Sequence, residues 1–210
     1  MVDTSANEQL DHLSLGRVLL DGGVRFLQLR MKGASDEEHL AILPTLQEMC
    51  ASRGAQLLVN DRLDVAAQVA GVGVHLGQDD ADPVAARNLL GEGPLIGLST
   101  HNPSQVRAAC RLPVDYIGYG PIFSAIGKHH SSLDQRIPQS AVGLASLKQA
   151  VAEATVPVVA IGGIQLEHLP LLLATGVHAA AVISAVTCAV DCSEAVHAFQ
   201  QGFAGISPGI

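Results

Sequence analysis

The sequence predicts an α/β fold: a (β/α)8 barrel of the TIM type whose first strand is short or degenerate. Short runs rich in Val, Ile and Leu recur along the 210 residues, and a longer segment with helical spacing follows each of them. The runs are apolar almost throughout, which is typical of parallel strands buried on both faces. This even alternation favours a closed barrel over an open doubly wound sheet, and no GxGxxG motif follows the first strand. The length favours one domain over residues 1–210.

Each expected strand is an apolar run that ends in polar or glycine residues. The runs are Val24–Leu29, Ala55–Asn60, Gly73–Leu76, Leu95–Leu98, Val114–Gly118, Val156–Ile161 and His178–Ile183. Only Met1–Asp3 precedes the first helical segment, so the opening strand of the barrel has to be short. Helices are expected over Asn7–Leu20, Ser35–Ser52, Asp82–Leu90, Asn102–Cys110, Leu144–Glu153, Leu166–Thr175 and Ser193–Phe203, of which the third and fourth open on Asp-Pro and Asn-Pro start signals.

Composition argues against several classes of protein. Twelve basic and 20 acidic residues give a formal net charge of −8, which argues against a general nucleic-acid binder. The longest uncharged stretch, Leu169–Val190, is interrupted by Pro170 and Gly176, so we interpret it as a helix, a turn and a buried strand rather than a membrane span. No secretory signal opens the chain and its four cysteines form no CxxC pair, so we expect a cytoplasmic protein with reduced thiols.

Cationic and amide side chains follow the Val24–Leu29 strand. Alternation places Gln28, Arg30 and Lys32 on one side of the chain, and two cations with an amide at the mouth of a barrel suit a phosphate-bearing ligand. Solvated charges are the alternative for Arg30 and Lys32. Ser99, which follows another strand, could bind a substrate amine or a phosphate.

Two carboxylates follow the next two strands. Asp61 and Asp80 leave adjacent strands of a parallel barrel, so they can converge on one Mg²⁺ with phosphate oxygens and water as the other ligands. Helix capping is the alternative for Asp61, and one of the acidic residues Asp79, Asp80 and Asp82 is expected to cap the helix that begins near Pro83. The glycines at 162 and 163 and the 182–185 segment end the last two strands, where barrels often bind phosphate.

Seven segments together resemble the thiamine phosphate synthase family. They are QLRMK (28–32), VNDRLDVA (59–66), GVHLGQDD (73–80), IGLSTH (96–101), DYIGYGPIF (115–123), VPVVAIGGI (156–164) and AAVISAV (180–186). The resemblance implies a βα-barrel transferase that joins 4-amino-2-methyl-5-hydroxymethylpyrimidine diphosphate to a thiazole phosphate, with or without a carboxylate. Diphosphate leaves, Mg²⁺ assists, and a pyrimidine methylene cation forms before the thiazole nitrogen attacks.

The resemblance also implies a role for each matching residue. Arg30, Lys32, Ser99 and Lys128 would act in catalysis, with Lys128 on the departing diphosphate. Asp61 and Asp80 would bind Mg²⁺. The remaining contacts would be Gln28 and Asn60 with the pyrimidine diphosphate, and Gly163, Ile183 and Ser184 with the thiazole phosphate.

The sequence departs from the family after Phe123. The family's Pro-Thr-x-Thr-Lys run reads Ser124-Ala125-Ile126-Gly127-Lys128 here, so two hydroxyls are missing. The altered loop and short first strand motivate an alternative, a non-catalytic barrel that binds thiamine precursors. A thiazole tautomerase is a further alternative, but that relative lacks the two aspartates and carries His in place of Pro121. The expected partners are small molecules, with a homo-oligomer left open.

Overall fold

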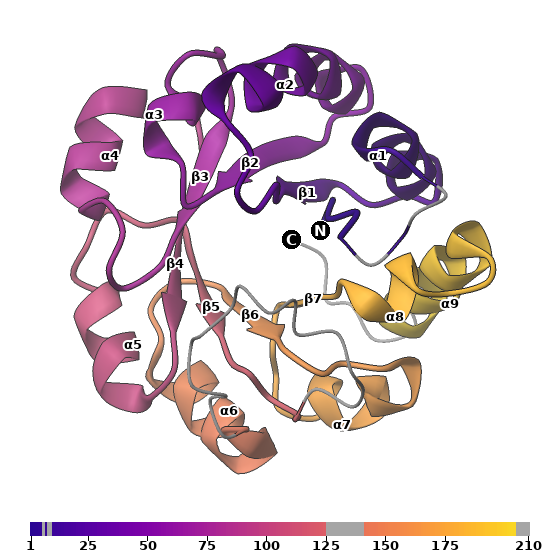
Figure 1. Ribbon diagram of the computed structural model, residues 1–210. Coiled ribbons are helices and arrows are strands. Elements are labelled where there is room, and N and C mark those ends of the chain that lie inside the picture. The colour runs from indigo at the N-terminus through magenta and orange to yellow at the C-terminus, as the bar shows by residue number, and fades with distance from the viewer. Residues whose placement is uncertain (6, 8–9, 125–140, 205–210) are drawn as a thin grey trace.

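Seven parallel strands form one sheet that curls into a barrel in the computed structural model, which describes residues 1–5, 7, 10–124 and 141–204 (Figure 1). Neighbours in the sheet are neighbours in the chain, as expected of a βα-barrel. The strands are β1 (Phe26–Leu29), β2 (Gln56–Asn60), β3 (Gly73–Leu76), β4 (Ile96–Thr100), β5 (Tyr116–Tyr119), β6 (Val158–Ile161) and β7 (Ala179–Ala181). All seven expected strands are therefore confirmed.

The first residues of the chain lie between β7 and β1, where the eighth strand of a barrel belongs (Figure 1). Val2 forms a parallel bridge with Leu29: its N–H donates to the Gln28 carbonyl at 2.8 Å, and its carbonyl accepts from the Arg30 N–H at 2.9 Å. On the other side, the Met1 amine donates to the carbonyl of Val182, just beyond β7, at 3.0 Å. The expected short or degenerate first strand corresponds to this isolated bridge at Val2, and Met1 and Val2 together hydrogen-bond to both edges of the sheet.

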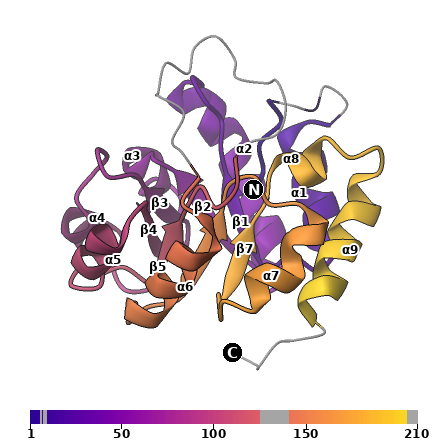
Figure 2. The ribbon, with the colours of Figure 1, turned by 90° about the horizontal axis from the view of Figure 1, so that it is seen from below.

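Helices surround the strands (Figures 1 and 2). They are α1 (His12–Asp21), α2 (Asp36–Ala51), α3 (Leu63–Ala66), α4 (Pro83–Leu90), α5 (Pro103–Ala109), α6 (Gly143–Glu153), α7 (Leu169–Leu173) with a 3₁₀ turn before it (Leu166–His168), α8 (Ser184–Thr187) and α9 (Cys192–Ala204). The expected helix start at Asn7 is wrong. Asp11 caps α1 by accepting from the Ser14 N–H at 2.7 Å, so the helix begins at His12.

Side chains that point outward from the strands pack against the helices to form the apolar core. Leu27 and Leu29 of β1 and Leu57 and Val59 of β2 are almost completely buried there. The Leu169–Val190 stretch folds as α7, a turn, β7 and α8, although β7 is only partly buried. Among the described residues, no helix is both long and apolar enough to cross a membrane.

Candidate active site

The end of β1 carries Gln28 in a buried position and Arg30 in a partly buried one. Arg30 Nη1 donates to Asp3 Oδ2 at 2.6 Å, and the Ser5 N–H donates to the other oxygen of Asp3 at 3.0 Å. Burial raises the pKa of Asp3, but the hydrogen bonds from Ser5 and Arg30 together outweigh it, so the pKa is lower than the ordinary value. Sequence reasoning missed Asp3. The short first strand therefore supplies the carboxylate that holds Arg30. Lys32 lies two residues further along and is exposed.

The end of β2 places Asn60 opposite His75 of β3, with Asp61 directly after it. Asp61 is exposed, its N–H donates to the His75 carbonyl at 2.8 Å, and its φ is +64°. Among the described residues it is the one non-glycine with a positive φ. The N-cap of α3 is Arg62 rather than Asp61, so helix capping does not explain Asp61. Aspartate is one of the non-glycine residues that adopt the left-handed region most readily, and here that conformation leaves its carboxylate exposed after the strand.

The loop after β3 presents Asp80. The Gly77 N–H donates to Asp80 Oδ2 at 2.6 Å, so this carboxylate is hydrogen-bonded to the backbone of its own loop. Asp82 instead caps α4, accepting from the Val84 N–H at 2.7 Å. The expected capping residue is thus Asp82, which leaves Asp80 exposed at the strand end.

The two carboxylates are candidate ligands for Mg²⁺. They follow adjacent strands, both are exposed, and hard oxygen donors suit this ion. No group of three or more His, Cys, Asp or Glu side chains that could hold a metal occurs among the described residues. A magnesium ion here would therefore take its other ligands from substrate and water, which is how Mg²⁺ is usually bound.

Ser99, on β4, is connected to the barrel interior. Its Oγ lies 2.9 Å from His75 Nε2, and the opposite ring nitrogen, Nδ1, lies 2.7 Å from the Tyr116 hydroxyl. Gln78 Nε2 donates to the Ser99 carbonyl at 2.6 Å. Burial lowers the pKa of His75 to about 4, against an opposing effect of the Asp80 charge, so the imidazole is neutral at physiological pH.

The ends of β6 and β7 carry the residues expected at the thiazole phosphate. Gly163 has a φ of +64°, and a Cβ atom there would lie 2.6 Å from the Phe123 carbonyl oxygen. Ile183 precedes α8 and Ser184 opens it, with the serine exposed. Lys128 lies outside the described residues, as does the rest of the 125–140 segment. His101 Nδ1 forms a hydrogen bond with the Gly120 carbonyl at 2.7 Å.

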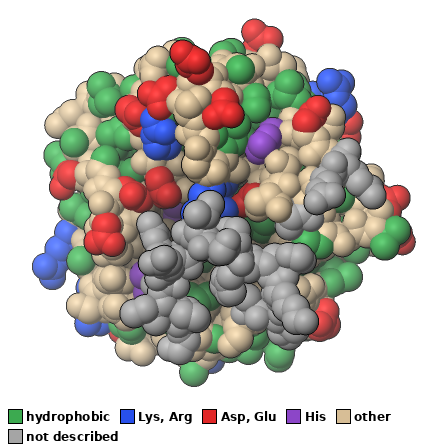
Figure 3. Space-filling view, in the orientation of Figure 1, with side chains coloured by type: hydrophobic (Ala, Val, Ile, Leu, Met, Phe, Trp, Pro, Cys, Tyr) green, Lys and Arg blue, Asp and Glu red, His purple; other side chains and the backbone are tan. Residues whose placement is uncertain are grey.

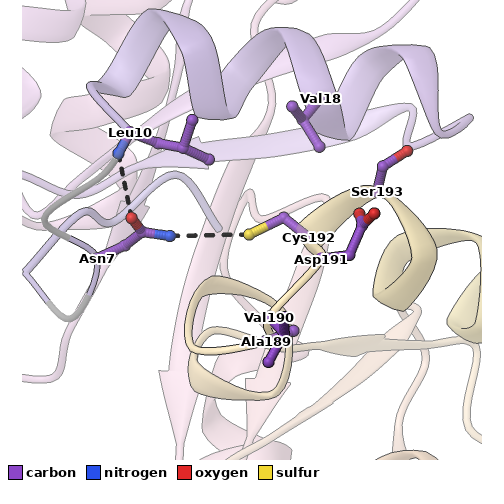
Figure 4. Close-up of a pocket in the computed structure, with 8 residues that line it drawn as sticks. All are labelled: Asn7, Leu10, Val18, Ala189, Val190, Asp191, Cys192 and Ser193. Carbon is purple, nitrogen blue, oxygen red and sulfur yellow. Dashed lines mark hydrogen bonds between the residues drawn. The ribbon is translucent and has the colours of Figure 1, made fainter.

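The face formed by the strand ends carries cationic side chains near its centre, with acidic side chains around them (Figure 3). The arrangement can bind an anionic ligand although the whole chain has a net charge of −8. A separate cavity of about 220 Å³ lies in the helical layer between α1 and the turn that leads into α9 (Figure 4). None of the predicted site residues lines it, so we assign it no part in the site.

Comparison with known proteins shows the family to which the chain belongs. The family model described as thiamine monophosphate synthase matches residues 1–186. A thiamine-phosphate synthase of Synechococcus sp. strain CC9605 is 43% identical over 183 residues, which are 87% of this chain and 50% of that protein. The chain also covers 46% of its Parasynechococcus marenigrum relative, so it spans about half the length of these two.

Other relatives match over nearly their full length. The thiamine-phosphate synthase of Salinibacter ruber is 34% identical over 98% of this chain and 88% of that protein. A solved structure titled thiamine phosphate pyrophosphorylase, from Pyrococcus furiosus, superposes with a TM-score of 0.84 at 31% identity and covers 97% of this chain and 93% of its own.

Proposed function

We propose that this chain, which belongs to the thiamine monophosphate synthase family, joins 4-amino-2-methyl-5-hydroxymethylpyrimidine diphosphate to a thiazole phosphate and releases diphosphate. The observation that carries the proposal is the grouping of an anchored arginine with two exposed carboxylates on neighbouring strand ends. Arg30 is fixed by Asp3, while Asp61 and Asp80 follow β2 and β3. A cation and a metal-binding pair in this arrangement suit a diphosphate ligand.

The pyrimidine diphosphate is assigned to the ends of β1, β2 and β4. Arg30 and Lys32 would bind the diphosphate, Gln28 and Asn60 the pyrimidine side, and Ser99 a further polar atom. Lys128 is assigned to the leaving diphosphate from the family motif. The C–O bond breaks with its electron pair on the diphosphate, so the cations serve by neutralising the charge that develops there. Asp61 and Asp80 would hold Mg²⁺, which would supply further positive charge to the leaving diphosphate.

The second substrate is assigned to the ends of β6 and β7. Gly163 lets the backbone come close to a ligand, and the backbone around Ile183 and Ser184 offers N–H groups to a phosphate. Holding the thiazole nitrogen in line with the methylene carbon replaces any need for a protein nucleophile, because the cation is reactive enough to be attacked directly. The assignment covers a thiazole phosphate with or without a carboxylate.

The test is a product assay with the full chain. Purified protein is given both substrates, with and without Mg²⁺, and Asp80→Ala is compared with Asp79→Ala, a neighbouring acidic residue that we assign no ligand role. We expect thiamine phosphate to form only with Mg²⁺, to fall at least a hundredfold in Asp80→Ala and to change little in Asp79→Ala. Absence of product from folded wild-type protein that still binds the pyrimidine diphosphate would reject the synthase and favour a thiamine-precursor-binding barrel.

A further inference from the structure

Three polar side chains form a hydrogen-bonded row inside the barrel beneath the proposed site. Tyr116 of β5 contacts His75 of β3 at 2.7 Å, and His75 contacts Ser99 of β4 at 2.9 Å. Tyr116 and His75 sit on either side of the same β4 residue, Gly97, in the strand register. The row therefore connects the interior of the barrel to a side chain at its functional end.

Glycines on β4 and β5 and an aromatic ring on β1 pack around the side chains of this row. A Cβ atom on Gly97 would lie 2.2 Å from Tyr116 Cζ and 2.5 Å from His75 Nδ1, so a larger residue there is incompatible with both rings. On β5, a Cβ atom on Gly118 would lie 3.1 Å from His75 Cε1. Phe26 packs edge-on against Tyr116 with the ring centroids 5.1 Å apart. The orientations of both rings are thus fixed by packing before any ligand binds.

The burial of Tyr116 decides the direction of the hydrogen bonds. Tyr116 is 7% exposed, and among the described residues its hydroxyl has no hydrogen-bond partner other than His75 Nδ1. If Nδ1 carried the proton, the phenol hydrogen would be buried without an acceptor, which is costly. Tyr116 therefore donates to Nδ1. The neutral imidazole then carries its proton on Nε2 and donates it to Ser99 Oγ.

We propose that Tyr116 and His75 are positioning residues that make Ser99 a hydrogen-bond donor to the substrate. Because Ser99 Oγ accepts from His75, its own proton is left to point toward a ligand acceptor. Ser99 would then donate to an oxygen of the diphosphate or to another acceptor on the ligand. The identity of the ligand rests on the proposed function, whereas the donor and acceptor assigned to each hydrogen bond in the row do not depend on it.

The direction can be measured in the ligand-free protein. Long-range ¹H–¹⁵N NMR of ¹⁵N-histidine-labelled full chain distinguishes a protonated from an unprotonated ring nitrogen, and His75→Gln identifies the His75 signals by their loss. We expect His75 to be protonated on Nε2 in the wild type. We expect this preference to weaken in Tyr116→Phe, which removes the donor and keeps the ring. A wild-type His75 protonated on Nδ1 would overturn the proposal whether or not the protein is a synthase.

The consequence for Ser99 is tested by a double-mutant cycle on kcat/KM. We expect Tyr116→Phe to lower kcat/KM by about three- to tenfold, the effect of one ordinary hydrogen bond. In a Ser99→Ala background the same substitution should have no further effect, since it acts through Ser99. Tyr119→Phe is the matched control, because this β5 hydroxyl bonds to Ser146 outside the row. Equal losses with and without the Ser99 hydroxyl would overturn the proposal, and an inactive wild type would reject the synthase instead.

Discussion

Replacing Asp3 with asparagine should lower the free energy of unfolding by about 1.5–3 kcal/mol at neutral pH. Arg30 Nη1 and Asp3 Oδ2 are 2.6 Å apart, and the two side chains are 29% and 5% exposed. A charge-assisted hydrogen bond contributes about 1.5–3 kcal/mol. Breaking a fully buried pair would cost about 3–5 kcal/mol, but Arg30 keeps access to water and the lower range applies.

The effect should depend on pH in a defined direction. The net lowering of the Asp3 pKa below 3.8 means that its ionised form is favoured in the folded protein. The stabilisation is therefore fully present above the unfolded pKa and is lost as the pH falls through the lower, folded pKa. The difference in stability between wild type and Asp3→Asn should stay constant from about pH 7 to pH 5 and shrink below about pH 4.

Urea unfolding of the wild type, Asp3→Asn, Arg30→Gln and the double variant measures the pair directly. We expect a coupling energy of about 1–2 kcal/mol between the two substitutions, and additivity within about 0.5 kcal/mol would refute the reasoning. Asp21→Asn is the matched control. Its partner Arg53 lies 2.8 Å away, but that carboxylate is 57% exposed, so its loss should cost under about 1 kcal/mol.

Three further substitutions are expected to affect stability, product formation or substrate binding to different extents. Asp61→Gly should relieve the strain of the left-handed backbone, so we expect the unfolding free energy to change by less than about 1 kcal/mol in unfolding curves. In the product assay, Mg²⁺-dependent product formation should fall at least about tenfold. Gly97→Ala should lower stability by about 1–3 kcal/mol in thermal unfolding, because its Cβ atom would overlap Tyr116. Gly163→Ala should lower stability by at least about 1 kcal/mol and raise the KM for the thiazole phosphate more than that for the pyrimidine diphosphate, since the added Cβ atom meets the Phe123 carbonyl. Equal effects on the two KM values would remove Gly163 from the thiazole side.

Hydrophobic patterning was enough to predict the strands because each is an apolar run bounded by polar or glycine residues. Asp-Pro and Asn-Pro likewise marked the starts of α4 and α5, whose N-caps are Asp82 and Asn102. The four-residue helices α3 and α8 escaped prediction, since one turn is too short to show a 3.6-residue period. The start of α1 was set by the Asp11 cap, which the apolar spacing did not reveal.

The sequence predicted which candidate residues lie at strand ends, but not which side chains on neighbouring strands contact them. Alternation along β1 placed Gln28 and Arg30 together because it depends on one strand alone. The partners Asp3 and His75 depend on which residues lie side by side on neighbouring strands, and register is not visible in a single sequence. The available signal for His75 was that it is the one polar residue inside the apolar run Gly73–Leu76.

The contact between Asp3 and Arg30 matters because the chain as a whole repels the ligand that we propose. Its net charge is −8, and the pyrimidine diphosphate is itself an anion. At physiological salt, charges more than about 8 Å away are largely screened, so the distant carboxylates count for little beside cations in direct contact. Asp3 offsets part of the Arg30 charge, yet it removes the need to order that side chain when the ligand binds. At low ionic strength the distant carboxylates are no longer screened, so we expect pyrimidine diphosphate binding to weaken. Tighter binding at low ionic strength would instead show that the local cations dominate.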